Sequence, residues 1–227
     1  MTEEALTPTE GPGSTGAPTT APGAGTLLRL LRDGRPRTRS ELASVTGLAR
    51  STVTQRVDAL LASGLIGPAG EAASTGGRPP TTFSFRPGAR VVLAADLGAT
   101  HARMALTDMS GTVLAEERAD LDIALGPEPV LDWVVDRGRG LLGDARRTTD
   151  ELLGLGIGLP GPVQHSTGRA VNPPIMPGWD DFDVPGYVHD RIDVPVMVDN
   201  DVNIMAIGEH HTAWPSASHL MFVKVAT

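Results

Sequence analysis

The sequence places a carboxylate beside a glycine turn in DLGAT, residues 96–100. Asp96 ends an expected strand, Gly98 permits a tight turn, and Thr100 follows the turn. Backbone N–H groups in such a turn can hold phosphate oxygens. A glycine hairpin without a ligand explains the same residues equally well. Other motifs must therefore decide between a phosphate loop and a simple turn.

Polar residues that could recognise a small ligand follow at three more turns. Gly161 lies in GIGLPGPV, where glycines let the backbone approach a ligand closely, and Asn172 lies in AVNPP. Asn200 and Asp201 follow in VMVDNDVN. Amide and carboxylate groups at chain turns suit the hydroxyl groups of sugars. Capping of the next helix, which contributes about 1 kcal/mol, would explain one of residues 199–201 but not all three.

The first half of the chain is expected to contain a helix-turn-helix whose second helix presents a polar face. Ala43, Gly47 and Val53 have the separations of a helix-turn-helix. The second helix has an apolar stripe that predicts its buried face, made of Val53, Val57, Leu60 and Leu61. The opposite face is then free to contact bases and phosphates of duplex DNA. The predicted DNA-binding residues are Arg50, Ser51, Thr52, Gln55 and Arg56. A helical hairpin with an ordinary polar face is the alternative.

The segment that follows predicts the wing of a winged helix. Residues 67–85 form a glycine-rich excursion that ends in the alternating Phe83, Ser84 and Phe85. Arg78 would lie at the tip of this hairpin, where an extended arginine suits the minor groove of DNA. The alternative is that Arg78 lies on a linker.

The charge distribution agrees with a polyanionic partner for the first module only. Residues 1–25 carry three acidic residues, residues 26–90 carry ten Arg and four acidic residues, and residues 91–227 carry nine basic and twenty acidic residues. The net charges are −3, +6 and −11, within a total of −8. A basic module on an acidic body favours nucleic-acid binding by the module. A solvated basic face is the alternative.

Composition excludes several other classes of protein. The chain has no cysteine, which excludes disulfides and thiolate zinc sites, and we predict no metal site in it. No apolar run approaches the roughly 20 residues that cross a bilayer, so no membrane partner is expected. Residues 1–25 lack the basic start and apolar core of a signal peptide, which favours a cytoplasmic location. Their Pro, Gly and Thr content predicts a disordered tail.

The remaining pattern predicts an α/β fold behind the winged helix-turn-helix. We expect domains at residues 26–88 and 89–227 after the tail. Residues 91–119 predict three antiparallel strands with turns at Gly98 and at Ser110–Gly111. The other predicted elements are a helix at 129–147, strands at 152–159 and 194–198, a helix at 201–212 and a final strand at 220–227.

Taken together, the motifs resemble the repressor branch of the ROK family of repressors, open reading frames and sugar kinases. The resemblance rests on the winged helix, GGRPP, DLGAT, GIGLPGPV, AVNPP, PGW, DNDVN and IGEHH, and covers residues 26–227. It implies an actin-like, ribonuclease-H-like sugar-kinase domain, of which this chain holds the first part. In the family, the residues matching Asp96, Gly98 and Thr100 meet ATP phosphates. The residues matching Gly161, Asn172, Asn200 and Asp201 bind sugar, and Asp201 matches the catalytic base.

The chain departs from the family pattern in several places. Asp199 replaces a glutamate, and Val171 and Val202 replace alanines. The family's zinc site and most of its ATP site would lie beyond Thr227, so no cofactor is expected in this chain. Because phosphoryl transfer depends chiefly on stabilising phosphate charge, we do not expect an enzyme.

The resemblance leads to one preferred function and two alternatives. The preferred function is a sugar-responsive repressor of carbohydrate metabolism genes. Its partners would be double-stranded operator DNA and a small sugar or sugar derivative, and a two-fold operator would favour a homodimer. The alternatives are an ATP-dependent, glucokinase-like sugar kinase and a DNA-binding module with a truncated, non-functional sensor.

Overall fold

The structure is a computed structural model, and it describes residues 23–72 and 79–225. The chain divides into two compact units, Met1–Arg86 and Pro87–Thr227, each of which is described by itself. The division falls two residues before the boundary expected from the sequence. Within the described ranges, no helix combines the length and the apolar character needed to cross a membrane.

The first unit has three helices, α1 (Ala24–Leu31), α2 (Arg39–Thr46) and α3 (Arg50–Ala62), of which α2 and α3 form the helix-turn-helix. Thr38 and Glu41 form a capping box that starts α2, and Gly47 ends α2 with a left-handed φ of 68°. The helix α1 begins within the segment expected to be the disordered tail. Ala24 is fully buried, so the expectation that the disordered tail reaches residue 25 is wrong for its last two residues.

A small sheet completes the first unit and confirms the predicted wing hairpin. Its strands are β1 (Arg37–Thr38), β2 (Ile66–Glu71) and β3 (Thr81–Phe85), in the order β1-β3-β2. The strand β1 was not predicted because two residues are too short to show an alternating pattern. The predicted tip residue Arg78 lies outside the described residues.

The core of the first unit follows the predicted apolar stripe with one correction. Val53, Val57 and Leu60 of α3 are fully buried, whereas Leu61 is only half-buried. Leu61 directly follows Leu60, so its side chain points to the edge of the face that α3 presents to the core. The buried partners of the stripe are Leu27, Leu31, Leu42, Ile66 and Phe83.

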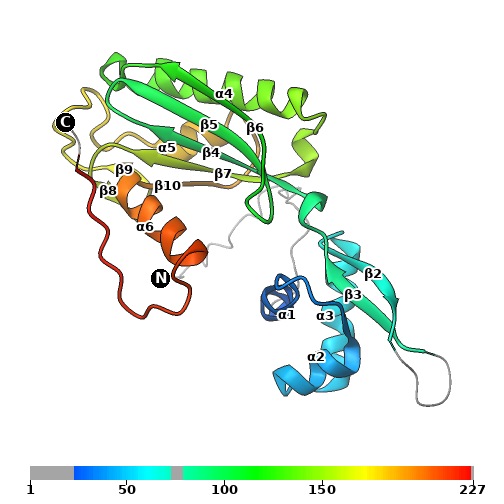
Figure 1. Cartoon of the computed structure of the whole chain (residues 1–227). Coiled ribbons are helices and arrows are strands. Elements are labelled where there is room, and N and C mark those ends of the chain that lie inside the picture. The colour runs from blue at the N-terminus through cyan, green and yellow to red at the C-terminus, as the bar shows by residue number, and fades with distance from the viewer. Residues whose placement is uncertain (1–22, 73–78, 226–227) are drawn as a thin grey trace, which may run out of the picture. The chain divides into compact units, whose positions relative to one another are not determined.

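A mixed five-stranded sheet forms the centre of the second unit (Figure 1). Its strands are β4 (Val91–Leu97), β5 (His101–Asp108), β6 (Val113–Asp120), β7 (Leu152–Leu159) and β10 (Val196–Asn200). Their order is β10-β7-β4-β5-β6, with β10, β7 and β4 parallel and β4, β5 and β6 antiparallel. The predicted three-stranded meander and the strand at 152–159 are confirmed. The strand β10 starts and ends two residues later than predicted.

Helices pack on both faces of this sheet: α4 (Pro127–Asp144), α5 (Val184–His189) and α6 (Asp201–Thr212). The bounds of α6 agree with the prediction. The helix α4 begins two residues earlier than predicted because proline fits the first helical turn. It ends three residues earlier than predicted, and Arg146 just after it has a left-handed φ of 54°. Shorter elements are η1 (Pro87–Ala89), η2 (Ile123–Leu125), η3 (Thr149–Glu151), β8 (Val163–Gln164) and β9 (Arg169–Ala170).

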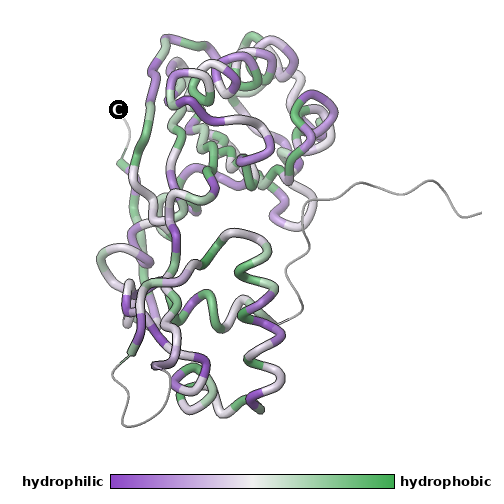
Figure 2. The backbone as a smooth tube through the Cα atoms, turned by 90° about the vertical axis from the view of Figure 1, so that its right-hand side faces the viewer, coloured by the Kyte–Doolittle hydropathy of each residue, from purple (hydrophilic) through white to green (hydrophobic). Residues whose placement is uncertain are grey.

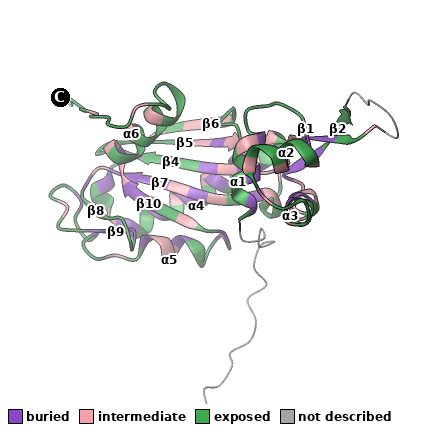
Figure 3. Cartoon of the chain, turned by 90° about the horizontal axis from the view of Figure 1, so that it is seen from below, coloured by how far each residue is buried: buried purple, intermediate pink, exposed green. Residues whose placement is uncertain are grey.

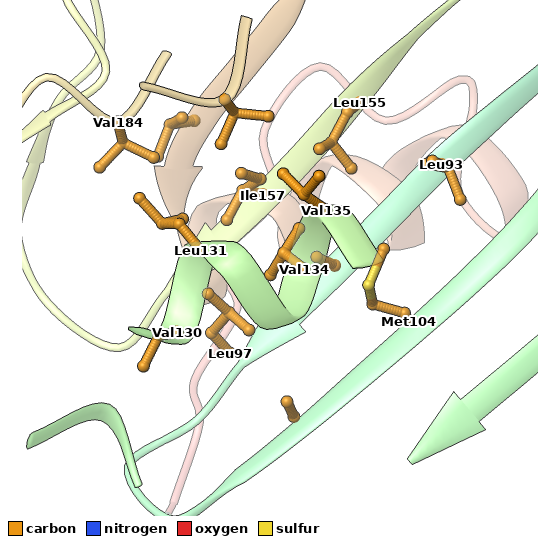
Figure 4. Close-up of a cluster of buried hydrophobic side chains, with 14 of the residues drawn as sticks. Leu93, Leu97, Met104, Val130, Leu131, Val134, Val135, Leu155, Ile157 and Val184 are labelled. Atoms are coloured by element: carbon orange, nitrogen blue, oxygen red, sulfur yellow. The ribbon is translucent and has the colours of Figure 1, made fainter. Parts of the chain in front are cut away.

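The hydrophobic core lies between the sheet and α4. Alternate strand residues point to this face, so the β4 residues Leu93 and Leu97 meet one side of α4 (Figure 4). Each large apolar side chain buried here contributes roughly 1.5–3 kcal/mol. The α4 residues of this core are Val130, Leu131, Val134, Val135, Leu141 and Leu142. Hydropathy alternates along the chain in both units, as expected for elements with one buried face (Figure 2).

The opposite face of the sheet carries small residues and lets α6 approach closely. A Cβ atom on Gly158 would lie 3.4 Å from the Cα of Asp201 and 3.5 Å from the Cδ1 of Ile204. The helix α6 and the stretch that follows it are largely exposed (Figure 3). The position of Asp201 is therefore set by a strand that has glycine where α6 crosses it.

The strand predicted at residues 220–227 is wrong for the residues that the structure describes. Residues 220–225 are irregular, and Met221 and Val225 are 86% and 89% exposed. A strand is stabilised by hydrogen bonds to a neighbouring strand, and none of the described strands pairs with this segment.

Candidate functional site

Asn200 joins the end of β10 to the GIGLPGPV turn. Its side-chain oxygen caps α6 by accepting a hydrogen bond from the Val202 N–H at 3.0 Å. Its side-chain nitrogen donates to the carbonyl oxygens of Gly161 at 2.9 Å and Leu159 at 3.4 Å. The two predicted sugar-binding residues Asn200 and Gly161 are therefore in direct contact. Because both amide hydrogens of Asn200 are engaged, its main role in this state is to hold the turn.

The predicted residue Asn172 lies close to the same turn. Its backbone has a left-handed φ of 43°, and its N–H donates to Oδ1 of Asp180 at 2.7 Å. A Cβ atom on Gly161 would lie 3.0 Å from Pro173 Cβ and from Met176 Sδ. Glycine at position 161 thus lets the loop that follows Asn172 pack against the turn. The side chain of Asn172 is exposed, where a ligand can reach it.

Asp201 is the most enclosed of the predicted ligand residues, with its side chain only 6% exposed. Its Oδ1 accepts from the Val202 N–H at 2.8 Å. Its Oδ2 accepts from the Lys224 Nζ at 2.6 Å. Both carboxylate oxygens are therefore engaged within the chain in this structure.

The neighbouring Asp199 organises the junction between β10 and α6. Burial disfavours its charge, but hydrogen bonds from Asn203 at 2.9 Å, His165 at 2.7 Å and the Asn200 N–H at 2.7 Å outweigh burial and lower its pKa. Sequence reasoning missed two of these partners. Asn203 follows Asp199 by four residues, a spacing that could have indicated it, whereas His165 is 34 residues away and carries no such signal.

Asp96 and Asp201 line one cavity of about 290 Å³ beside α6. Asp96 lies at the end of β4, opposite Arg103 of β5 and Gly158 of β7, and both of these residues also line the cavity. The structure therefore brings the predicted phosphate-loop carboxylate and the predicted sugar-binding carboxylate to one place, although 105 residues separate them in the sequence.

The glycine turn after β4 is closed by the protein itself. The Gly98 N–H donates to the His101 carbonyl oxygen at 2.8 Å, and a Cβ atom on Gly98 would clash with the His101 ring. Thr100 is exposed, and its carbonyl oxygen accepts from Leu121 at 3.2 Å. The Gly98 N–H is therefore engaged within the hairpin itself.

The predicted DNA-binding residues of α3 separate into two groups. Arg50, Ser51 and Gln55 are exposed, whereas Thr52 and Arg56 are half-buried. Arg56 follows Val53 by three residues and precedes Leu60 by four, so it flanks the buried stripe. Its guanidinium lies against Gly23, where a Cβ atom would be 2.5 Å from the arginine Nη2. The prediction that Arg56 lies on the face opposite the core is therefore wrong.

The first turn of α3 lacks a side-chain cap. Ala49 is the N-cap residue, and its methyl group accepts no hydrogen bond. The N–H groups of the first helical turn, at Arg50, Ser51 and Thr52, therefore have no side-chain acceptor at the cap, and the positive end of the helix dipole lies beside them. Such a helix start is suited to a phosphate group.

Two of the ten arginines of the basic module stabilise the module itself. Arg37 pairs with Asp33 at 2.5 Å, and this contact lowers the pKa of the Asp33 carboxyl. Arg39 pairs with Asp58 at 2.7 Å and stacks over the Phe83 ring with its guanidinium carbon 4.6 Å from the ring centroid. The charge count alone did not distinguish these arginines from Arg50, whose side chain is exposed. Across residues 23–72 and 79–225, no group of three or more His, Cys, Asp or Glu side chains could hold a metal ion.

Comparisons with known proteins cover both units. Residues 92–227 match the ROK family, and residues 26–66 match a winged helix-turn-helix DNA-binding family. The chain is 28% identical over 200 residues to a putative xylose repressor from Caldicellulosiruptor sp. strain Rt8B.4. The matching region is 88% of this chain and 50% of that protein. The chain is 27% identical over 202 residues to the xylose repressor of Bacillus subtilis strain 168, covering 88% of this chain and 52% of that protein.

A solved structure agrees with the fold. The crystal structure of a ROK family transcriptional regulator, a homologue of the Escherichia coli MLC protein, has a TM-score of 0.70 at 22% identity and covers 83% of this chain and 48% of that one. The chain thus spans about half the length of the curated relatives that it matches. With a winged helix-turn-helix ahead of an α/β unit that matches over residues 92–227, the chain belongs to the ROK family.

Proposed function

We propose that this chain is a transcriptional repressor whose affinity for double-stranded operator DNA is changed by a sugar. The observation that carries the proposal is the start of α3, where exposed Arg50 and Ser51 surround an uncapped helix terminus within a winged helix-turn-helix. Exposed Gln55 lies one turn further along, where it could contact a base edge. Phosphate contacts would position the helix, and Gln55 would supply sequence discrimination.

The sugar would bind where the predicted polar residues of the second unit converge. Asn172 offers an exposed amide, Asp201 offers a carboxylate, and Gly161 and Asn200 form the turn between them. Donors and acceptors of this kind suit vicinal hydroxyls. The names of the relatives, xylose repressor and N-acetylglucosamine repressor, make D-xylose and N-acetyl-D-glucosamine the first candidates.

A sugar-binding regulator and a sugar kinase make different demands on Asp201. In this structure, Oδ2 of Asp201 faces the Lys224 ammonium at 2.6 Å, so it can accept a proton from an attacking hydroxyl only after this contact is broken. Regulation by a sugar needs no chemical step, because a ligand shifts an equilibrium through its different affinities for the two states.

The test is a fluorescence polarisation titration of the full chain with duplexes selected from a random-sequence library, repeated with D-xylose and with N-acetyl-D-glucosamine. Sugar binding that changes DNA affinity a hundredfold corresponds to a coupling free energy of about 2.7 kcal/mol. An ADP-release assay with ATP and each sugar measures kinase activity in parallel. Selective duplex binding that responds to a sugar without ADP release supports the proposal. Binding no tighter than to non-specific duplex at equal salt overturns it.

A further inference from the structure

Lys224 is the only lysine in the chain, and the other 18 cationic side chains of the Lys and Arg set are arginines. Its Nζ lies 2.6 Å from Oδ2 of Asp201, a residue 23 positions earlier in the sequence. The two side chains differ in environment, because Lys224 is 36% exposed and Asp201 is 6% exposed. The contact therefore joins an accessible ammonium group to an enclosed carboxylate.

This contact fixes the far end of an irregular segment. After α6, the His210 Nε2 contacts the Ala217 carbonyl oxygen at 2.8 Å and holds the start of residues 213–225. Lys224 holds the end of the segment through Asp201. Between the two contacts, Met221 and Val223 are strongly exposed. Little apolar burial therefore accompanies the Lys224 contact along this part of the described segment.

The pair differs from an ordinary surface ion pair, which contributes about 0–1 kcal/mol. An enclosed carboxylate that loses its cation stays away from water without compensation, and this is unfavourable. It needs another donor, and a sugar hydroxyl is one. Lysine suits such an exchange because its ammonium is a single strongly hydrated group on a flexible stem that can withdraw into solvent.

We propose that Lys224 occupies the ligand position at Asp201 in the sugar-free state. A sugar hydroxyl that donates to Oδ2 of Asp201 displaces the ammonium and frees the Lys224 side chain. The inference rests on the proposed function, since it takes the sugar as the displacing ligand. Occupation of the Asp201 carboxylate by the sugar and release of the Lys224 ammonium are two sides of one exchange.

The single lysine makes the exchange directly measurable. Acetylation of the full chain by a water-soluble N-hydroxysuccinimide ester, followed by peptide mass spectrometry, reports the accessibility of the one ε-amino group, with the α-amino group as internal control. We expect Asp201→Asn to speed acetylation of Lys224 by about tenfold, the factor that corresponds to roughly 1.4 kcal/mol. Saturating D-xylose or N-acetyl-D-glucosamine, whichever binds, should speed it similarly in the wild type and have no further effect in Asp201→Asn.

Sugar affinity supplies a second readout. Lys224→Met removes the competitor and should bind the sugar several-fold more tightly, as measured by calorimetry, whereas Lys224→Arg should stay close to the wild type. Equal acetylation rates in the wild type and Asp201→Asn would overturn the proposal, as would weaker sugar binding by Lys224→Met. A sugar that changes DNA affinity but not the acetylation rate overturns the exchange and leaves the proposed function standing. Absence of any sugar effect on DNA affinity, acetylation and heat together overturns both.

Discussion

The starts of α3 and α6 are built in opposite ways. The helix α3 begins at an alanine that provides no side-chain cap, whereas α6 begins at Asn200, whose side chain caps the helix and is tied to Gly161. An uncapped, exposed helix start can accept a phosphate without first losing an internal contact. A filled start must exchange one partner for another. The difference indicates that the proposed DNA site needs no internal rearrangement, whereas the chain itself occupies the proposed ligand site.

The cationic side chains show the same contrast. Arg50 at the start of α3 is exposed, whereas Lys224 contacts the carboxylate of Asp201 at the start of α6. Response to a ligand requires that the ligand distinguish two states of the protein. Only the second region, where an internal contact competes with the ligand, has this property built in.

The largest expected effect concerns the start of α6. Asn200→Ala removes the cap of α6 and the hydrogen bonds to Gly161 and Leu159. A lost cap costs about 1 kcal/mol and each lost hydrogen bond about 0.5–1.5 kcal/mol, so we expect a free energy of unfolding lower by about 2–4 kcal/mol. Urea denaturation measures the change. Asn172→Gly removes an exposed amide and keeps a residue that tolerates the left-handed φ of 43° at this position, so it is the control and should change stability little. Equal losses in the two variants would show that Asn200 does not hold the site.

The next largest effect concerns the start of α3. Arg50→Ala should weaken duplex binding across sequences and reduce the salt slope by about 1 if Arg50 contacts a phosphate, while Gln55→Ala should cost about 1–3 kcal/mol of base discrimination. Fluorescence polarisation at several salt concentrations separates the two. Arg37→Ala is the control, because Arg37 pairs with Asp33. A salt slope that falls with Arg37→Ala and not with Arg50→Ala would contradict the assignment.

Capping α3 would make its start resemble that of α6. Ala49→Ser places a hydroxyl acceptor beside the free N–H groups and should stabilise the winged helix by about 1 kcal/mol. The same hydroxyl competes with DNA phosphate, so duplex affinity should fall as stability rises. Thermal denaturation and polarisation titration on the same sample test the opposite signs. Stability and affinity that rise together would mean that phosphate does not use this helix start.

The sequence predicted the elements that repeat a local pattern and missed what depends on distant contacts. The apolar periodicity of residues 53–60 and the alternating strands from residue 91 predicted α3 and the meander, because each carries its pattern within one element. The winged helix and the predicted ligand residues around Gly161 followed from motif order. Arg56 was misplaced because the sequence interpretation did not distinguish the edge of the buried stripe from the opposite face of α3.

The contacts made by Lys224 and His165 had no local signal. Lys224 lies 23 residues from Asp201, and His165 lies 34 residues from Asp199. Only folding places these side chains against their carboxylates. The strand expected at residues 220–227 failed for a related reason, since an apolar alternating segment forms a strand only when another strand pairs with it. Sequence therefore located the candidate site but not the contacts that hold it closed.

The smallest expected effect is the pH dependence of the stability that Asp199 contributes just before α6. The pKa of Asp199 is lowered in the folded chain because its hydrogen bonds outweigh burial. A carboxyl with a lowered folded pKa stabilises the fold above its unfolded pKa of about 3.9, and the contribution is lost as pH falls through the lower, folded value. Asp199→Asn should therefore lower the free energy of unfolding at pH 7 and make it less dependent on pH below about 4. Urea denaturation from pH 3 to 7 measures both. His165→Ala removes one donor and should reduce the acid dependence partly, whereas an unchanged profile in both variants would mean that Asp199 does not stabilise the start of α6.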